Sequence, residues 1–140
     1  MTRLHATCVT IGRHAVLLIG ASGSGKSDLA LRLIDRGAVL VSDDQTELTR
    51  TGDALIAAPP ATIAGLIEVR GLGIFTLPYR AEAPVALAVR LGEAVIRMPE
   101  MALTEEFSGI AIPLIRVDSR DASAPVKVEW ALKRVISEAS

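Results

Sequence analysis

A run of glycine, serine and lysine residues near the amino terminus has the spacing of a loop that binds phosphate groups. The pattern Gly-x-x-x-x-Gly-Lys-Ser/Thr is matched in full by Gly20, Ala21, Ser22, Gly23, Ser24, Gly25, Lys26 and Ser27. In such a loop the glycines let backbone amides approach an anion, the lysine places positive charge at the β- and γ-phosphates, and the serine hydroxyl ligates Mg²⁺. We therefore predict that residues 20–27 bind the phosphates of a nucleotide. The alternative is a glycine-rich turn that merely precedes a helix.

Two adjacent acids, Asp43 and Asp44, directly follow the next apolar run, residues 38–41. We expect this run to be a parallel strand beside the strand that leads into the loop, so that its carboxyl end points at the γ-phosphate and the metal. One carboxylate is enough for the metal. The other is either a general base for an attacking hydroxyl or a solvated turn residue.

Three further polar residues have roles that the sequence alone leaves open. His5 stands near the start of the first predicted strand, where it either contacts a phosphate or is structural, as a lone histidine usually is. Glu68 and Arg70 are placed on one face of a predicted strand. They either reach a metal and a phosphate or form an exposed salt bridge.

The elements that must position these residues are readable from apolar runs, turn residues and helical spacing. We predict strands over residues 4–11, 15–19, 38–41, 47–49, 54–58, 66–70, 74–77, 85–91 and 110–117, and helices over 27–36 and 126–139. Residues 97–109, with Pro99 and several acids, predict a mobile surface segment. On the last helix Trp130 falls opposite the apolar stripe and is predicted to face outward, either packed against a loop or contacting a subunit or partner.

The overall composition predicts one globular domain, residues 1–140. Hydrophobic residues make up 50% of the chain and aromatic residues 3%, which favours a Val-, Leu-, Ile- and Ala-rich core of strands covered by helices. The formal net charge of -1 and the scattered basic residues argue against nucleic acid as a partner. No apolar stretch approaches the roughly 20 residues of a membrane span. The single Cys8 predicts a buried structural thiol in a reducing, cytoplasmic setting.

Taken together, these residues resemble the bacterial HPr kinase/phosphorylase family, whose members act on a serine of the phosphocarrier protein HPr. The resemblance runs through His5 and His14, the loop at 20–27, Arg36-Gly37 and the Asp43-Asp44 pair, and it resumes at Glu68-Val69-Arg70-Gly71-Leu72-Gly73-Ile74. It covers about the first half of the chain.

The resemblance implies an α/β P-loop kinase domain with a mixed β-sheet, similar to phosphoenolpyruvate carboxykinases, in the short form that consists of the catalytic domain alone. It implies ATP-dependent phosphorylation of an HPr-like carrier protein with Mg²⁺, regulation of the phosphotransferase system, phosphate-dependent dephosphorylation as a reverse reaction, and a homo-oligomer.

The resemblance also implies roles for the matched residues. Asp43 is expected to be the general base, and Asp44 to support the metal and the phosphate loop. His5 is expected to contact the transferring phosphate. Metal ligation is implied for Ser27 and Glu68, and handling of the phosphoserine or phosphate for Arg70, Gly71 and Gly73.

The sequence departs from the long family members between residues 117 and 125, where those members have an arginine- and glycine-containing stretch. Arg116, Arg120 and Lys127 are the basic residues available to take its place, and none aligns with it residue by residue. Two other readings stay open: a kinase of a small molecule or of a different protein, and a nucleotide-binding regulator that transfers no phosphoryl group.

Overall fold

The computed structural model describes residues 1–95 and 102–139. Its strands are β1 (Thr2–Leu4), β2 (Ala6–Ile11), β3 (His14–Ile19), β4 (Val39–Ser42), β5 (Thr46–Thr51), β6 (Ala54–Ala58), β7 (Leu66–Val69), β8 (Gly73–Thr76), β9 (Ala83–Leu91), β10 (Leu103–Phe107) and β11 (Ile110–Val117). The helices are α1 (Lys26–Asp35) and α2 (Ala124–Ala139), with a short 3₁₀ turn, η1 (Ala61–Ile63). Among the described residues, no helix combines the length and the apolar character of a transmembrane segment.

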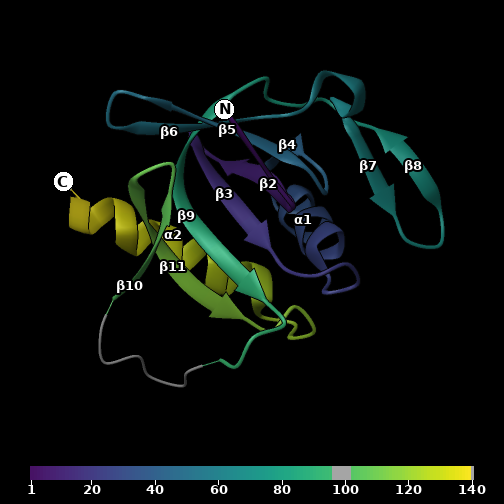
Figure 1. Ribbon diagram of the computed structural model, residues 1–140. Coiled ribbons are helices and arrows are strands. Elements are labelled where there is room, and N and C mark those ends of the chain that lie inside the picture. Colours follow the sequence, from purple (N-terminus) through teal and green to yellow (C-terminus); the bar gives the residue numbers. More distant parts are fainter. Residues whose placement is uncertain (96–101, 140) are drawn as a thin grey trace.

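Most of the strands form one curled, mixed sheet, as predicted, with both helices behind it (Figure 1). The strand order is β1-β5-β6-β9-β3-β2-β4, and β11 joins β9 with β10 outside it. β9 is the centre of this arrangement. It runs parallel to β3 along one side, while the other side pairs with β6 at the start of the strand and with β11 at its end.

The predicted neighbour of the loop strand is wrong. β4 does not lie beside β3, because β2 lies between them and pairs antiparallel with both. The reason is the tight turn at Gly12 and Arg13, which makes β2 and β3 a hairpin and leaves the other edge of β2 free for β4. Since β2 opposes both strands, β3 and β4 still run in the same direction. Their carboxyl ends therefore reach the same edge of the sheet, which is what the site requires.

The predicted mobile segment is also wrong in part. Residues 103–107 form β10, which folds back on β11 through a turn at Ser108 and Gly109. Glu105 and Glu106 are neighbours on β10, and only Glu106 is exposed. Glu105 is half-buried and paired with Arg90 of β9, whose Nε lies 2.7 Å from the carboxylate. Residues 97–101 lie outside the described part of the chain.

The core consists of two apolar layers, one on each face of the sheet. The layer under the helices includes Leu18, Leu29, Leu33 and Leu132. The other is enclosed by the curled strands themselves and includes Leu17. Leu17 and Leu18 belong to different layers because successive side chains of β3 point to opposite faces. The sheet is thus buried on both sides, which fits its continuous apolar strands.

Cys8 is fully buried in the second layer, as predicted, and burial raises the pKa of its thiol. A raised pKa keeps the thiol protonated, and the thiolate is the reactive form. We expect the native chain at pH 8 to leave Cys8 unlabelled by a maleimide, and the chain unfolded in guanidinium chloride to be labelled fully. Rapid labelling of the native chain would contradict this placement.

Candidate active site

The phosphate loop connects the end of β3 to the start of α1. Gly23 and Gly25 have φ angles of +84° and +96°, a left-handed backbone that strongly favours glycine. Gly20 is favoured by lack of space instead, because a Cβ there would clash with Ser24 Oγ and would lie 3.0 Å from the carbonyl oxygen of Leu91. The glycines of the motif therefore hold the chain in a turn that brings the end of β9 against the loop.

Lys26 is turned into the loop. Its Nζ donates to the carbonyl oxygens of Gly20 and Ala21, at 2.9 and 3.1 Å. The side chain is only 5% exposed. An ammonium group has three donors, and these two hydrogen bonds leave one for an anion. The predicted phosphate-binding lysine is thus held at the loop by the loop's own backbone.

Asp43 is the acid that contacts the loop. Its Oδ1 accepts hydrogen bonds from the hydroxyls of Ser27 at 2.6 Å and Thr7 at 3.1 Å, and its Oδ2 accepts one from the backbone amide of Glu68 at 3.0 Å. The residue is 8% exposed. Both carboxylate oxygens are therefore engaged by protein donors from α1, β2 and β7. Sequence reasoning missed Thr7, for which the only signal was a hydroxyl in a buried apolar strand.

Asp44 faces a different partner. Its Oδ1 lies 2.6 Å from Nε2 of His5, between β1 and β2, and both side chains are partly exposed. The backbone of Asp44 is left-handed, with φ of +68°, and its amide donates to the hydroxyl of Thr7. This reversal of the chain sends the two adjacent acids in different directions: Asp43 into the phosphate loop, and Asp44 to the open side beside His5.

Glu68 and Arg70 do not share a strand face as predicted. β7 ends at Val69, and Arg70 begins the turn that also contains Gly71, with φ of +86°. Both charged side chains are exposed. The hairpin of β7 and β8 stands apart from the main sheet (Figure 1), and it reaches the site through the Glu68 amide on Asp43.

A turn formed by residues 118–121 also lies against the phosphate loop, and sequence reasoning missed this contact. The hydroxyl of Ser119 donates to the carbonyl oxygen of Ser24 at 2.7 Å. Arg32 of α1 donates to the carbonyl oxygens of Ser119 and Asp121. No local signal could have found these pairs, because 95 residues separate Ser24 from Ser119.

Arg120, one of the basic residues that the sequence offers in place of the arginine- and glycine-containing stretch of the long family members, is committed to its own turn. It donates to both carboxylate oxygens of Asp118 through its guanidinium and to one of them through its backbone amide. The side-chain hydrogen bonds of Arg120 lower the pKa of Asp118 to about 2. Arg116 is paired with Glu93 and Lys127 with Asp121.

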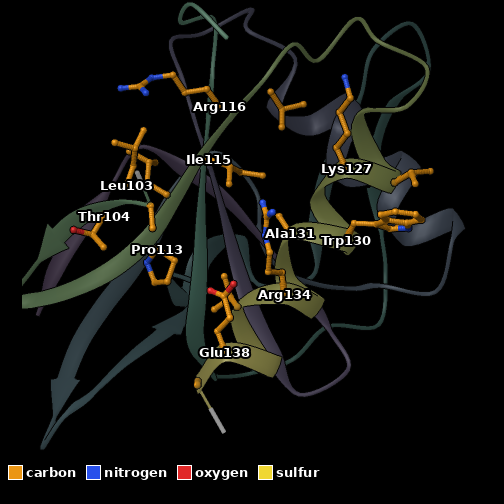
Figure 2. A pocket seen from close by; sticks show the side chains of 16 residues that line it. Leu103, Thr104, Pro113, Ile115, Arg116, Lys127, Trp130, Ala131, Arg134 and Glu138 are labelled. Carbon is orange, nitrogen blue, oxygen red and sulfur yellow. The ribbon is translucent and has the colours of Figure 1, made fainter. Parts of the chain in front are cut away.

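A cavity of about 820 Å³ lies away from the loop, between the β10–β11 hairpin and α2. Figure 2 shows Leu103 and Pro113 of the strands facing Arg134 of the helix across it. Trp130, also in its lining, is 69% exposed, as predicted. None of the residues 5, 20–27, 43–44 or 68–73 lines this cavity, so it is separate from the candidate active site.

The arrangement around Ser27 fits a nucleotide-bound Mg²⁺. Because the hydroxyl proton of Ser27 is committed to Asp43, the oxygen lone pairs are left for a cation, and a partner that orients a ligand in this way is typical of metal sites. The described residues contain no group of three or more His, Cys, Asp or Glu side chains at metal-binding spacing. Mg²⁺ commonly takes one or two protein ligands and completes its shell with phosphate oxygens and water.

The strand–loop–helix with its lysine inside, the acid on the loop serine and the mixed sheet define a domain with the P-loop kinase fold. The family model "HPr Serine kinase C-terminal domain" matches residues 1–122, and the chain belongs to this family.

The relatives support this assignment over nearly the whole chain. The HPr kinase/phosphorylase of Bordetella pertussis is 33% identical over 96% of this chain and 48% of its own length. That of Clostridium tetani is 33% identical over 84% of this chain and 38% of its own. The solved structure of the HPr(Ser) kinase/phosphatase from Coxiella burnetii superposes with a TM-score of 0.86 at 28% identity, covering 99% of this chain and 93% of that one. The chain spans less than half the length of the two curated relatives.

Proposed function

We propose that residues 1–140 form a catalytic domain that transfers the γ-phosphoryl group of ATP to a serine hydroxyl of an HPr-like phosphocarrier protein. The observation that carries this proposal is the hydrogen bond between Ser27 and Asp43 beside the inward-facing Lys26. It joins the loop, the metal-binding serine and the acidic strand end in one site. The names of the relatives, HPr kinase/phosphorylase, supply the carrier protein. Regulation of the phosphotransferase system and a place in the cytoplasm, which the resemblance implies, are part of the same proposal.

The geometry supports a division of labour between the two acids that differs from the one the resemblance implies. Asp43 has both oxygens engaged and is nearly buried, so it serves to hold Ser27 for Mg²⁺. Asp44 is exposed and held by His5, so its carboxylate is the one that a substrate hydroxyl can approach. A general base must come within hydrogen-bond reach of the proton it takes. We therefore assign the base to Asp44.

In phosphoryl transfer the protein mainly positions the reacting groups and neutralises the charge on the phosphates. The serine oxygen of the carrier forms a bond to the γ-phosphorus, the bond to the β-phosphate oxygen breaks, and the serine proton passes to Asp44. Lys26 offsets the charge on the phosphates. Ser27 and the predicted ligand Glu68 would hold Mg²⁺, which would supply positive charge to offset the charge on the phosphate oxygens. Arg70, Gly71 and Gly73 form the turn of the neighbouring hairpin, which we assign to the serine-bearing segment of the carrier.

The reverse reaction uses the same groups. In phosphate-dependent dephosphorylation, an oxygen of inorganic phosphate forms a bond to the phosphorus of the phosphoserine and the bond from that phosphorus to the serine oxygen breaks. Asp44 returns its proton to the serine oxygen, and pyrophosphate leaves. Homo-oligomer formation, as the resemblance implies, is part of the same proposal. Sedimentation velocity of the purified chain measures it directly.

Incubation of the purified chain with an HPr-like protein, γ-labelled ATP and Mg²⁺ tests the proposal. We expect label on a serine of the carrier, none on the carrier with that serine replaced by alanine, and loss of label on adding inorganic phosphate. If the chain binds ATP by calorimetry yet labels no carrier protein, the kinase assignment is overturned in favour of a nucleotide-binding regulator.

A further inference from the structure

The 118–121 turn is the part of the chain that supports the phosphate loop from outside the motif. We propose that Ser119 and Arg32 are positioning residues for nucleotide binding. They hold the peptide between Ser24 and Gly25 in the orientation that receives phosphate, and they therefore set nucleotide affinity. This inference rests on the proposed binding of nucleotide by residues 20–27 and adds a second, distant segment to that site.

The hydrogen bond from Ser119 fixes the direction of one peptide unit. Its hydroxyl donates to the carbonyl oxygen of Ser24 at 2.7 Å. A trans peptide is planar, so its C=O and its N–H point in opposite directions. Holding the Ser24 carbonyl toward Ser119 therefore points the Gly25 amide away from Ser119. That amide belongs to the set which the motif presents to phosphate.

Packing reinforces the hydrogen bond. A Cβ built on Gly25 would lie 2.5 Å from Ser119 Oγ and 2.8 Å from Ser119 Cβ. The turn is thus in direct contact with the backbone of the loop. Gly25 also needs its φ of +96°, so two independent constraints meet at the residue before Lys26. Movement of Ser119 would be transmitted to Gly25 without an intervening side chain.

Arg32 fastens the turn to the helix that begins at the loop. Its guanidinium donates to the carbonyl oxygens of Ser119 and Asp121, and its Nε lies 3.1 Å from Asp28. Within the turn, the amide of Asp121 donates to the carbonyl oxygen of Asp118 at 3.1 Å. The loop, α1 and the turn therefore close a ring of contacts. Such a ring reduces the conformational freedom that phosphate binding would otherwise have to remove.

Helix α1 supplies a matched control. Arg36, one helical turn beyond Arg32, also reaches the carboxyl-terminal part of the chain, where it is paired with Glu129 of α2. Replacing either arginine by alanine removes a polar link between α1 and that part of the chain. Only Arg32 is linked to the turn that touches the loop. Arg36→Ala therefore shows how far nucleotide affinity falls when a link between α1 and the carboxyl-terminal part is lost without any change at the turn.

Calorimetric titration of the full chain with MgATP, and separately with inorganic triphosphate, tests the inference without any carrier protein. We expect Ser119→Ala and Arg32→Ala each to weaken binding of both ligands by about 5-fold, the effect of losing one or two hydrogen bonds. Arg36→Ala should stay within about twofold of the wild type at a similar unfolding temperature. The double variant should lose less than the product of the single losses, because both residues act on one peptide.

Unchanged affinity in Ser119→Ala, or an equal loss in Arg36→Ala, overturns the positioning role. Where phosphoserine formation is measured as well, the KM for ATP should rise while kcat at saturating ATP is retained; a fall in kcat alone contradicts it. If the wild-type chain binds both ligands but makes no phosphoserine, the proposed function is refuted and the positioning role is not. If the wild-type chain binds neither ligand, both the nucleotide site and the positioning role are refuted.

Discussion

Asp44→Asn is expected to lower the kcat for phosphoserine formation by about 10²- to 10⁴-fold while the affinity for MgATP stays within a few-fold. The substitution keeps the size of the side chain and a hydrogen bond to His5, but it removes the group that takes the serine proton. Asp44 is exposed and, among the described residues, its carboxylate is hydrogen-bonded to His5 alone, so the fold should tolerate the change. Steady-state kinetics with saturating carrier protein measure the effect, and calorimetry measures the affinity.

Two further variants make this result decisive. Asp53→Asn changes an exposed acid in the β5–β6 turn and should leave kcat unchanged. Asp43→Asn should raise the Mg²⁺ concentration needed for half-maximal rate and lower the unfolding temperature, because it weakens the contacts to Ser27 and Thr7. If Asp43→Asn instead removes turnover at full MgATP affinity while Asp44→Asn retains it, Asp43 is the base and our assignment is reversed.

Lys26→Met is expected to weaken MgATP binding by about 30- to 100-fold, equivalent to about 2–3 kcal/mol, the loss of charged hydrogen bonds to the phosphates. Methionine keeps a similar length without the charge. It also leaves the carbonyl oxygens of Gly20 and Ala21 without their donor, so part of the loss reflects a looser loop. Calorimetric titration measures the affinity, and the rise in unfolding temperature caused by MgATP should shrink in parallel.

Lys133→Met, at an exposed position of α2, provides the comparison for loss of one positive charge. It should bind MgATP as the wild type does. Wild-type affinity in Lys26→Met would mean that nucleotide does not bind at the phosphate loop, and it would refute the kinase proposal.

The sequence predicted the local features of this fold well and the long-range ones poorly. The phosphate loop, α1 and the closing helix α2 were found because glycine positions and helical spacing are properties of neighbouring residues. The place of β2 between β3 and β4 depends on which edge of the β2–β3 hairpin each distant strand pairs with. The local sequence does not determine that pairing. β10 was missed because Glu105 was read as solvated, whereas Arg90 from another strand pairs with it.

The same limit applies to the candidate site. The sequence placed Asp43 and Asp44 at the correct edge of the sheet, but adjacency along the chain carries no information on which acid turns inward. That choice follows from the left-handed backbone at Asp44 and from donors on three other elements. Ser119 was not found at all, since an isolated serine in a polar turn is unremarkable until the fold brings it against Gly25.

The central position of β9 bears on how the protein is made. This strand pairs with β3, near the amino terminus, and with β11, near the carboxyl terminus. During synthesis β9 and β11 must therefore leave the ribosome before the sheet can close, and until β9 emerges the edges of β3 and β6 that pair with it have no partner. Topologies dominated by such distant pairings fold slowly and expose strand edges meanwhile. The nascent chain is consequently most vulnerable to aggregation just before β9 and β11 emerge.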